Sequence, residues 1–209
     1  MEAVLLADVP GGDVFTAGSS AVAADQLTAR GASVTSFDVN AIDLALCIGC
    51  FDCWGKTPGR CRFRDDGDDV ARAIVNADVV VLVGPVLFGG YSAGLKRVMD
   101  RMLPTLMPML ARQDGEVYRL ARYRRPAALV AIGTLPEPDV ANERTFRGMV
   151  ERNALHLHAP AFGVAVLEGS MPTTEVRLAV QGAFAAVDHA AATPRALQPR
   201  NTRHLTVRP

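Results

Sequence analysis

The sequence lacks an excess of charge of either sign, because 22 Lys and Arg residues balance 22 Asp and Glu residues among its 209 residues. A chain with no net charge creates no overall field of the kind that attracts nucleic acid or an anionic membrane. It also lacks an apolar run of the roughly 20 residues that cross a bilayer, and no basic segment precedes a short apolar stretch at its start. We therefore expect a cytoplasmic protein whose partners are small molecules, with no nucleic-acid partner and no membrane partner.

Cysteine is absent outside one short stretch, since all four cysteines lie between positions 47 and 61. Such clustering favours a local site over a disulfide framework that joins distant parts of a secreted protein. A chain of 209 residues can bury a sizeable core without disulfides, and one domain is the simplest organisation. No serine lies in a nucleophile elbow and no histidine is placed to serve one. We therefore expect no hydrolase triad and assign no catalytic side chain.

Short apolar runs alternate along the chain with longer segments of helical periodicity. The runs are nearly continuous in apolar residues, as in strands covered on both faces, and predict five parallel strands at residues 3–7, 33–39, 79–83, 127–132 and 162–167. The predicted helices are residues 19–30, 66–76, 92–103, 140–158 and 174–189. Asp65 and Asp66 favour the start of the second helix, and Gly31 favours the end of the first. This alternation predicts an α/β domain with a doubly wound sheet and helices on both faces.

A doubly wound sheet binds ligands outside the carboxyl ends of its strands, so the loops that follow the predicted strands are candidate sites. After the first strand, residues 8–20 form a glycine-rich stretch that leads into a helix. Free amides and hydroxyls at a helix start can hold a phosphate, and the candidate donors are Thr16, Ser19 and Ser20. The same residues could instead be simple N-caps, and the acidic side chains of this loop would repel a phosphate that no Lys or Arg attracts.

After the third strand, residues 84–90 form a loop that contains one proline and three glycines. Such a loop exposes backbone groups and little side-chain bulk, so a flat heteroaromatic ligand could lie against it. The alternative interpretation is that the glycines only permit tight turns and close helix packing. On the helix that follows, Lys96, Asp100 and Arg101 are expected to form ion pairs with a structural role.

The four cysteines follow the pattern C-x2-C-x2-C-x7-C, at Cys47, Cys50, Cys53 and Cys61. This spacing directs several sulfurs into one small volume, and four thiolates suit a [4Fe–4S] cluster, whose irons take soft anionic ligands. Zinc suits the spacing less well, because zinc sites usually separate two short cysteine pairs by a longer loop. A disulfide, or inert thiols that shape a subunit contact, remains an open alternative. Trp54, which follows the third cysteine, is expected to be a core or interface aromatic.

Over most of its length the chain resembles the NADPH-dependent FMN reductase and iron-sulfur flavoprotein family of the flavodoxin-like fold. The residues that carry the resemblance are the cysteine motif at 47–61, Asp65, Asp66, the segments 84–89 and 92–96, Asp100, Arg101, Arg122, Tyr123, Pro126, Gly133 and Thr134. It implies a five-stranded sheet in the order 2-1-3-4-5 and an FMN-binding domain that spans residues 1–192. Residues 193–209 lie outside it and form a basic, proline-containing tail, which is expected to be extended.

The resemblance implies FMN as the cofactor, with its phosphate in the first loop, and NAD(P)H as the electron donor. It implies that the isoalloxazine ring lies along Pro85, Val86, Leu87, Phe88 and Gly89, with further contacts near Gly133 and Thr134. It also implies a homodimer or homotetramer, because members of this family often complete the flavin site with a neighbouring subunit. The first loop departs from the family pattern, since members usually begin it with Gly-Ser-x-Arg and this chain has Ala7-Asp-Val-Pro10.

We therefore expect an NAD(P)H-dependent FMN or quinone-type reductase, in which hydride passes from the nicotinamide to the flavin while the protein supplies placement and electrostatics. One alternative is an iron-sulfur flavoprotein that carries electrons, with a [4Fe–4S] cluster at the four cysteines. Another is a flavin-free binding protein of the same fold, in which the altered first loop no longer holds a phosphate.

Overall fold

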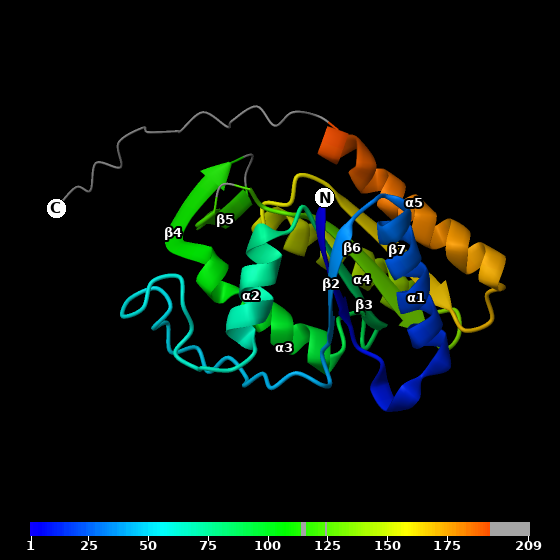
Figure 1. Cartoon of the computed structure of the whole chain (residues 1–209), viewed down its shortest axis with the longest axis horizontal. Coiled ribbons are helices and arrows are strands. Elements are labelled where there is room, and N and C mark those ends of the chain that lie inside the picture. The colour runs from blue at the N-terminus through cyan, green and yellow to red at the C-terminus, as the bar shows by residue number, and fades with distance from the viewer. Residues whose placement is uncertain (114–115, 124, 193–209) are drawn as a thin grey trace.

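The computed structural model of the protein describes residues 1–113, 116–123 and 125–192. A five-stranded parallel sheet runs through its centre in the order β2-β1-β3-β6-β7 (Figure 1). Its strands are β1 (Glu2–Ala7), β2 (Ser33–Asp38), β3 (Val79–Pro85), β6 (Ala128–Leu135) and β7 (Phe162–Glu168). Counted within this sheet the order is 2-1-3-4-5, which confirms the predicted order and is that of the flavodoxin-like fold.

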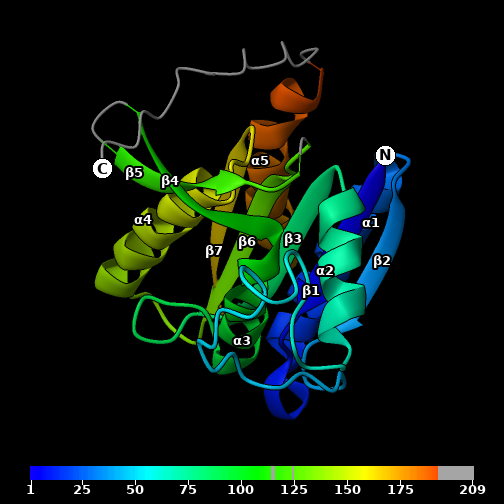
Figure 2. The ribbon, with the colours of Figure 1, turned by 90° about the vertical axis from the view of Figure 1, so that its left-hand side faces the viewer.

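Helices cover both faces of the sheet, as Figures 1 and 2 show. One face carries α1 (Val14–Ala29) and α5 (Thr173–Ala192), and the other carries α2 (Gly67–Asn76), α3 (Ala93–Arg101) and α4 (Val140–His156). Each face has its own apolar core, so the molecule has two cores separated by the sheet. Because β3 and β6 contribute to both cores, their side chains are buried at nearly every position, as the continuous apolar runs predicted.

The second strand differs from the prediction that all five strands are covered on both faces. Among the described residues, β2 pairs only with β1 and forms one edge of the sheet, and all of its side chains are exposed or half-buried. Its sequence, Ser-Val-Thr-Ser-Phe-Asp, is more polar than the other four runs. An edge strand of this composition has one side open to water and resists pairing with another chain.

A two-stranded hairpin between α3 and β6 was absent from the sequence-based prediction. It consists of β4 (Leu106–Gln113) and β5 (Glu116–Ala121), which pair antiparallel and form a sheet of their own. The hairpin escaped prediction because β4 contains Pro108 and no β-branched residue, and proline inside an apolar run counts against a strand. The short η2 helix (Leu103–Thr105) joins the hairpin to α3.

Two helix starts also differ from the sequence-based expectation. The first helix begins at Val14 rather than near residue 19, because the Asp13 carboxylate accepts a hydrogen bond from the Phe15 amide and caps the helix there. The second helix begins at Gly67, but Asp66 at its N-cap position makes no capping bond with the helix. The Asp66 carboxylate instead accepts a hydrogen bond from the amide of Asp43.

The predicted basic tail at 193–209 lies outside the described residues. Among the described residues, no helix combines the length and the apolar character that crossing a bilayer requires.

Candidate functional site

The carboxyl ends of β1, β3 and β6 meet at one edge of the sheet, and the loops that follow them lie side by side. The amide of Asp8, just after β1, donates to the carbonyl of Val83 in β3 at 2.8 Å. The amide of Val86, just after β3, donates to the carbonyl of Thr134 in β6 at 2.9 Å. The predicted phosphate loop and the predicted ring loop are therefore neighbours, as the fold requires of a shared ligand site.

In the first loop, two of the three side chains predicted to hold a phosphate form hydrogen bonds within the protein. The hydroxyl of Thr16 is fully buried and lies 2.5 Å from the Asp13 carboxylate and 2.7 Å from the hydroxyl of Thr134. The hydroxyl of Ser19 donates to the carbonyl of Phe15 at 2.9 Å, while Ser20 is half-buried. The carboxylate of Asp13 thus occupies the helix start that the sequence assigned to a phosphate.

A second carboxylate lies at the same edge. Asp8 is 4% exposed, and its Oδ1 accepts a hydrogen bond from the side-chain amide of Asn40 at 2.9 Å. Asp8 and Asp13 together give the first loop two acidic side chains. An anion that enters this loop must overcome their repulsion or displace them.

The loop after β3 is built as a tight turn with an exposed tip. Leu87 and Gly90 exchange backbone hydrogen bonds of 3.0 and 2.9 Å, and the two central residues have positive φ angles, 51° at Phe88 and 73° at Gly89. Positive φ at both central positions is typical of a type I′ turn. Phe88 is 99% exposed, so the turn presents a large aromatic ring to its surroundings from a backbone conformation that costs a non-glycine residue about 1–2 kcal/mol.

Close packing fixes this turn against its neighbours. A Cβ atom on Gly89 would lie 2.5 Å from the Cβ and Cγ2 atoms of Thr145 in α4, so a larger residue does not fit there. A Cβ atom on Gly133 would lie 2.4 Å from Val86 and 2.9 Å from Phe146. The structure thus brings the predicted ring-contact residues of β3 and β6 together, although Val86 and Gly133 are buried beneath the loop rather than exposed at its surface.

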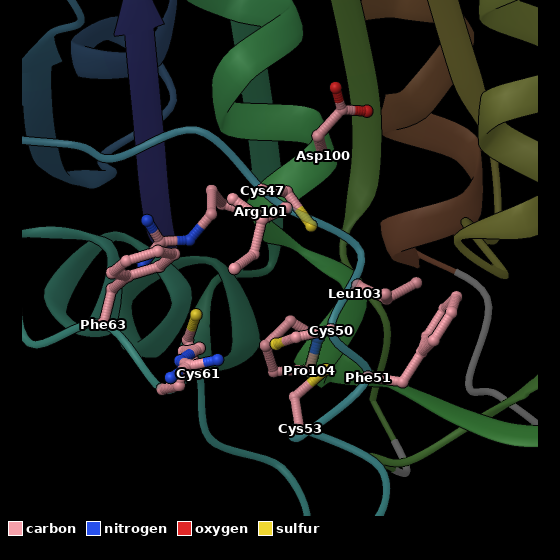
Figure 3. Close-up of a pocket in the computed structure, with 12 residues that line it drawn as sticks. Cys47, Cys50, Phe51, Cys53, Cys61, Phe63, Asp100, Arg101, Leu103 and Pro104 are labelled. Carbon is pink, nitrogen blue, oxygen red and sulfur yellow. The ribbon is translucent and has the colours of Figure 1, made fainter.

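The cysteine segment lies between β2 and α2 in a stretch that forms no helix or strand. All four cysteines line one pocket, together with residues of the C-terminal end of α3 and of η2 (Figure 3). All four are free thiols; Cys53 is buried, Cys61 is half-buried, and the other two are exposed. Burial raises the pKa of the Cys53 thiol, and charge on each of the other three cysteines raises it further, so the four thiols lie within electrostatic reach of one another.

A buried ion pair forms one wall of this pocket. The guanidinium of Arg101 binds both carboxylate oxygens of Asp65, at 2.7 and 2.8 Å, and donates a further bond of 2.7 Å to the carbonyl of Ala45. The side chains are only 1% and 6% exposed. The hydrogen bond from Arg101 is the main cause that lowers the pKa of Asp65, and the Asp65 bond, with smaller effects of Cys61 and Cys47, raises the pKa of Arg101.

One donor of this ion pair has no acceptor. Arg101 Nε is buried and makes no hydrogen bond with the described residues. An unsatisfied buried donor costs about 1–3 kcal/mol, more when it is charged, so such groups are rare without a reason. This orphaned donor fits a pocket that holds an acceptor supplied from outside the chain.

Trp54 joins the cysteine segment to the hairpin. Its indole nitrogen donates to the carbonyls of Leu103 and Leu106 at 3.2 and 3.1 Å. The ring of Phe51 stacks on it with centroids 5.0 Å apart, and the guanidinium of Arg119 in β5 lies 4.2 Å from the ring centroid. Trp54 is therefore an aromatic of an internal interface, as expected.

The four thiols suit one kind of metal group better than another. No three His, Cys, Asp or Glu side chains of the described residues converge on a point that could hold a single metal ion. A zinc ion needs all its sulfurs at about 2.3 Å from one centre, whereas a cubane cluster spreads its four ligands over the corners of a larger body. Four thiols around one pocket, with a buried cation and its orphaned donor beside them, fit a cluster better than zinc.

FMN fits the strand edge at one end more readily than at the other. The exposed turn at 87–90 offers an open surface to a flat ring, whereas the start of α1 is occupied by the Asp13 carboxylate. Sequence reasoning found both loops and the repulsion within the first, but it missed that Asp13 caps the helix. It also treated Arg101 as structural and missed its place in the cysteine pocket, because no pattern links it to Asp65, which is 36 positions away.

Comparison with known proteins gives matches over most of the chain. The model of the family described as NADPH-dependent FMN reductase matches residues 1–165. An iron-sulfur flavoprotein of Methanocaldococcus jannaschii is 45% identical over 62 residues, which is 30% of this chain and 31% of that protein. An iron-sulfur flavoprotein of Archaeoglobus fulgidus is 34% identical over 79 residues, which is 38% of this chain and 35% of that protein. The chain thus matches only about a third of the length of each of these two relatives.

Solved structures with a similar fold cover nearly the whole chain. An FMN-dependent NADH-azoreductase of Bacillus anthracis, in complex with FMN, has a TM-score of 0.60 with 12% identity and covers 91% of this chain and 96% of its own. An NAD(P)H:quinone oxidoreductase of Methanothermobacter marburgensis has a TM-score of 0.62 with 16% identity and covers 87% of this chain and 96% of its own. At such low identity the likeness shows a shared fold alone.

Proposed function

Because this chain belongs to the NADPH-dependent FMN reductase family, we propose that it is an FMN-dependent oxidoreductase that takes electrons from NAD(P)H and passes them to a small acceptor of the quinone type. The observation that carries this proposal is the exposed turn at Leu87–Gly90, which stands at the carboxyl edge of the sheet next to the start of α1. A flavin-binding domain at residues 1–192 is part of the proposal.

When bound, FMN would supply a ring that accepts hydride from a reduced nicotinamide. The chain would hold that ring with the loop residues Pro85, Val86, Leu87, Phe88 and Gly89 and, from β6, with Gly133 and Thr134. The two cross-turn hydrogen bonds use the amides of Leu87 and Gly90, which leaves the amides of Phe88 and Gly89 to donate to a ligand. Donors fixed in place before the reaction stabilise negative charge without reorganising.

At the other end of the site, Thr16, Ser19 and Ser20 remain the proposed phosphate contacts, and the two buried hydroxyls would have to leave their present partners to reach a ligand. The backbone amides at the start of α1 are better placed than these hydroxyls to donate to a phosphate. They become available when the Asp13 carboxylate turns away. A phosphate in this loop is therefore in competition with the protein's own carboxylate.

The test is an absorption spectrum of the purified protein and a titration with FMN, followed by anaerobic mixing of the loaded protein with NADPH and with NADH. We expect saturable binding and bleaching of the flavin band by at least one nucleotide. Loaded protein that neither nucleotide reduces would reject the reductase. Protein that binds no FMN at all would favour the flavin-free binding protein instead.

An iron-sulfur flavoprotein is the second candidate, and a specific feature favours it. Four free thiols line one pocket beside the buried guanidinium of Arg101, whose Nε has no acceptor among the described residues, and two relatives matched in part are named iron-sulfur flavoproteins. The ligands would be Cys47, Cys50, Cys53 and Cys61, and a [4Fe–4S] cluster there would carry single electrons. Iron and sulfide analysis after anaerobic purification tests this, with Cys53→Ser expected to lower the iron content and to leave FMN binding intact.

We also propose that the protein assembles as a homodimer or homotetramer. The hairpin supports this, since Met109, Leu110 and Val117 are between 42% and 57% exposed on its two strands. Exposed apolar side chains gathered on one element are typical of subunit contacts. Light scattering on the wild type and on Leu110→Glu tests the proposal, because a charge in the contact should lower the mass of the particle.

A further inference from the structure

Arg101 is the feature of the cysteine pocket that neither the fold nor the reductase reaction explains. It is 2% exposed, and its two terminal nitrogens are used by Asp65 and by the carbonyl of Ala45. Its Nε is buried, has no acceptor among the described residues and belongs to a residue that lines the pocket. Arg97 Nε is also buried without a partner, but Arg97 does not line the pocket, so Arg101 is distinguished by an open donor at the thiols.

The surroundings of Arg101 hold its side chain in one orientation. The Asp65 carboxylate binds both terminal nitrogens of Arg101. The ring of Phe63 lies 5.5 Å from the guanidinium carbon, and the ring and the guanidinium lie at the same wall of the pocket (Figure 3). Bidentate binding to a carboxylate fixes the plane of a guanidinium. The charge is therefore held in the wall of the pocket that the four thiols line, and cannot swing away into solvent.

We propose that Arg101 donates from Nε to sulfur of an iron-sulfur cluster held by Cys47, Cys50, Cys53 and Cys61, and so raises the reduction potential of that cluster. Asp65 is the positioning residue that orients Arg101 and moderates its charge. This inference rests on the second candidate function, the iron-sulfur flavoprotein.

The direction follows from charge. One-electron reduction adds one negative charge to the cluster, and a nearby cation with a donated hydrogen bond stabilises the reduced state more than the oxidised state. Removing Arg101 therefore lowers the potential. Removing only the charge of Asp65 raises it, because the guanidinium remains and its counter-charge is lost. A purely structural ion pair predicts no such opposite shifts.

The experiment is a spectroelectrochemical titration of anaerobically purified, full-length protein, with iron and sulfide content measured on each sample. For Arg101→Gln we expect the equilibrium constant for one-electron reduction to fall at least tenfold, which is about 59 mV for a one-electron couple. Arg101→Lys keeps the charge but loses the planar fork, and we expect an intermediate potential. Asp65→Asn should raise the potential, with the equilibrium constant for one-electron reduction increased threefold or more.

Arg97→Gln is the matched control. Arg97 lies on the same helix, and its Nε is also buried without a partner, but it does not line the cysteine pocket. We expect the equilibrium constant for one-electron reduction of this variant to stay within twofold of the wild-type value. If Arg101→Gln fails to fold because Asp65 is left unpaired, the double variant Asp65→Asn/Arg101→Gln removes both charges together and should still have a lower potential than the wild type.

Two failures are distinguishable. Wild-type protein without iron and sulfide overturns the cluster function and this inference with it, whatever the FMN content. Protein that holds a full cluster, but whose potential is the same in Arg101→Gln, Asp65→Asn and wild type, overturns only the role of Arg101. Shifts of the same sign in both single variants would also overturn it.

Discussion

The loops after β1 and β3 leave the same edge of the sheet from neighbouring strands, and their side chains are used in opposite ways. In the first loop, Asp13 and Thr16 bind each other, the helix and β6. In the third loop, Leu87 and Phe88 are 49% and 99% exposed at the tip of a strained turn. Side chains of the first loop thus already have hydrogen-bond partners within the protein, whereas those at the tip of the loop after β3 are exposed and open to contact with a ligand.

This difference separates two kinds of ligand contact at one site. A ligand can approach the third loop without breaking any hydrogen bond within the protein. A phosphate can enter the first loop only by displacing the carboxylate that caps α1. Substitutions in the first loop should therefore change phosphate binding and stability, and substitution of the exposed ring in the third should change ligand binding alone.

The largest effect is expected from Asp13→Ser. Serine also caps helices, so α1 should keep its start. Repulsion between two unit charges near 6 Å apart is on the order of 3 kcal/mol at an effective dielectric constant of about 20. Its removal should tighten FMN binding roughly 30- to 100-fold, by the rule of about 1.4 kcal/mol for each factor of ten. Fluorescence titration with FMN, and with riboflavin as the ligand that lacks the phosphate, measures the effect.

Riboflavin affinity should not change in Asp13→Ser. Asp139→Ser removes the carboxylate that caps α4 by the same kind of bond, and is the matched variant outside the first loop. We expect it to leave the ratio of FMN to riboflavin affinity within about threefold of the wild type, since Asp139 caps a different helix and lies outside the first loop. An unchanged ratio in Asp13→Ser would show that Asp13 does not compete with the phosphate.

Gly89→Ala is expected to have the next largest effect, on the free energy of unfolding. The new methyl group would lie 2.5 Å from Thr145, and the residue would keep a φ of 73°. Overpacking costs about 1–3 kcal/mol, and we expect a loss of about 2 kcal/mol in chemical denaturation. Gly148→Ala is the control on α4, where a methyl group meets nothing within 4 Å. It should stabilise the protein by about 0.5–1 kcal/mol.

Thr16→Val tests the first loop with a smaller effect. It removes the hydroxyl between Asp13 and Thr134 and leaves the buried hydroxyl of Thr134 without that partner, which should cost about 1–2 kcal/mol of stability. Thr28→Val is the control on the same helix, where the hydroxyl binds only an exposed carbonyl, and it should change stability by less than about 0.5 kcal/mol. Equal losses in the two variants would contradict the idea that the first loop is committed to the fold.

Apolar runs predicted the five strands of the sheet, because parallel strands buried on both faces leave a clear mark in sequence, and the resemblance to the family implied their order. The same reasoning located both loops at the carboxyl edge. It could not tell that the hydroxyls of Thr16 and Ser19 face inward, because the face of a helix that is buried depends on tertiary packing. The β4–β5 hairpin has no clear strand signal, since proline interrupts its first strand, and no sequence pattern links Asp65 to Arg101, so both features required the structure.

Phe88→Gly is expected to change stability least, and it makes the sharpest contrast with the first loop. The ring is 99% exposed, so its loss removes little packing, and glycine relieves a φ of 51°. Relief of this backbone conformation should offset the added freedom of the unfolded chain, and we expect the free energy of unfolding to stay within about 0.5 kcal/mol of the wild type.

FMN affinity or the rate of reduction by NAD(P)H should fall instead, by about fivefold, since exposed aromatic surface held by strain is useful only to a bound ligand. Chemical denaturation and FMN titration of the same samples measure both quantities. Lower stability with unchanged binding and reduction would place Phe88 with the first loop, as a residue that serves the fold.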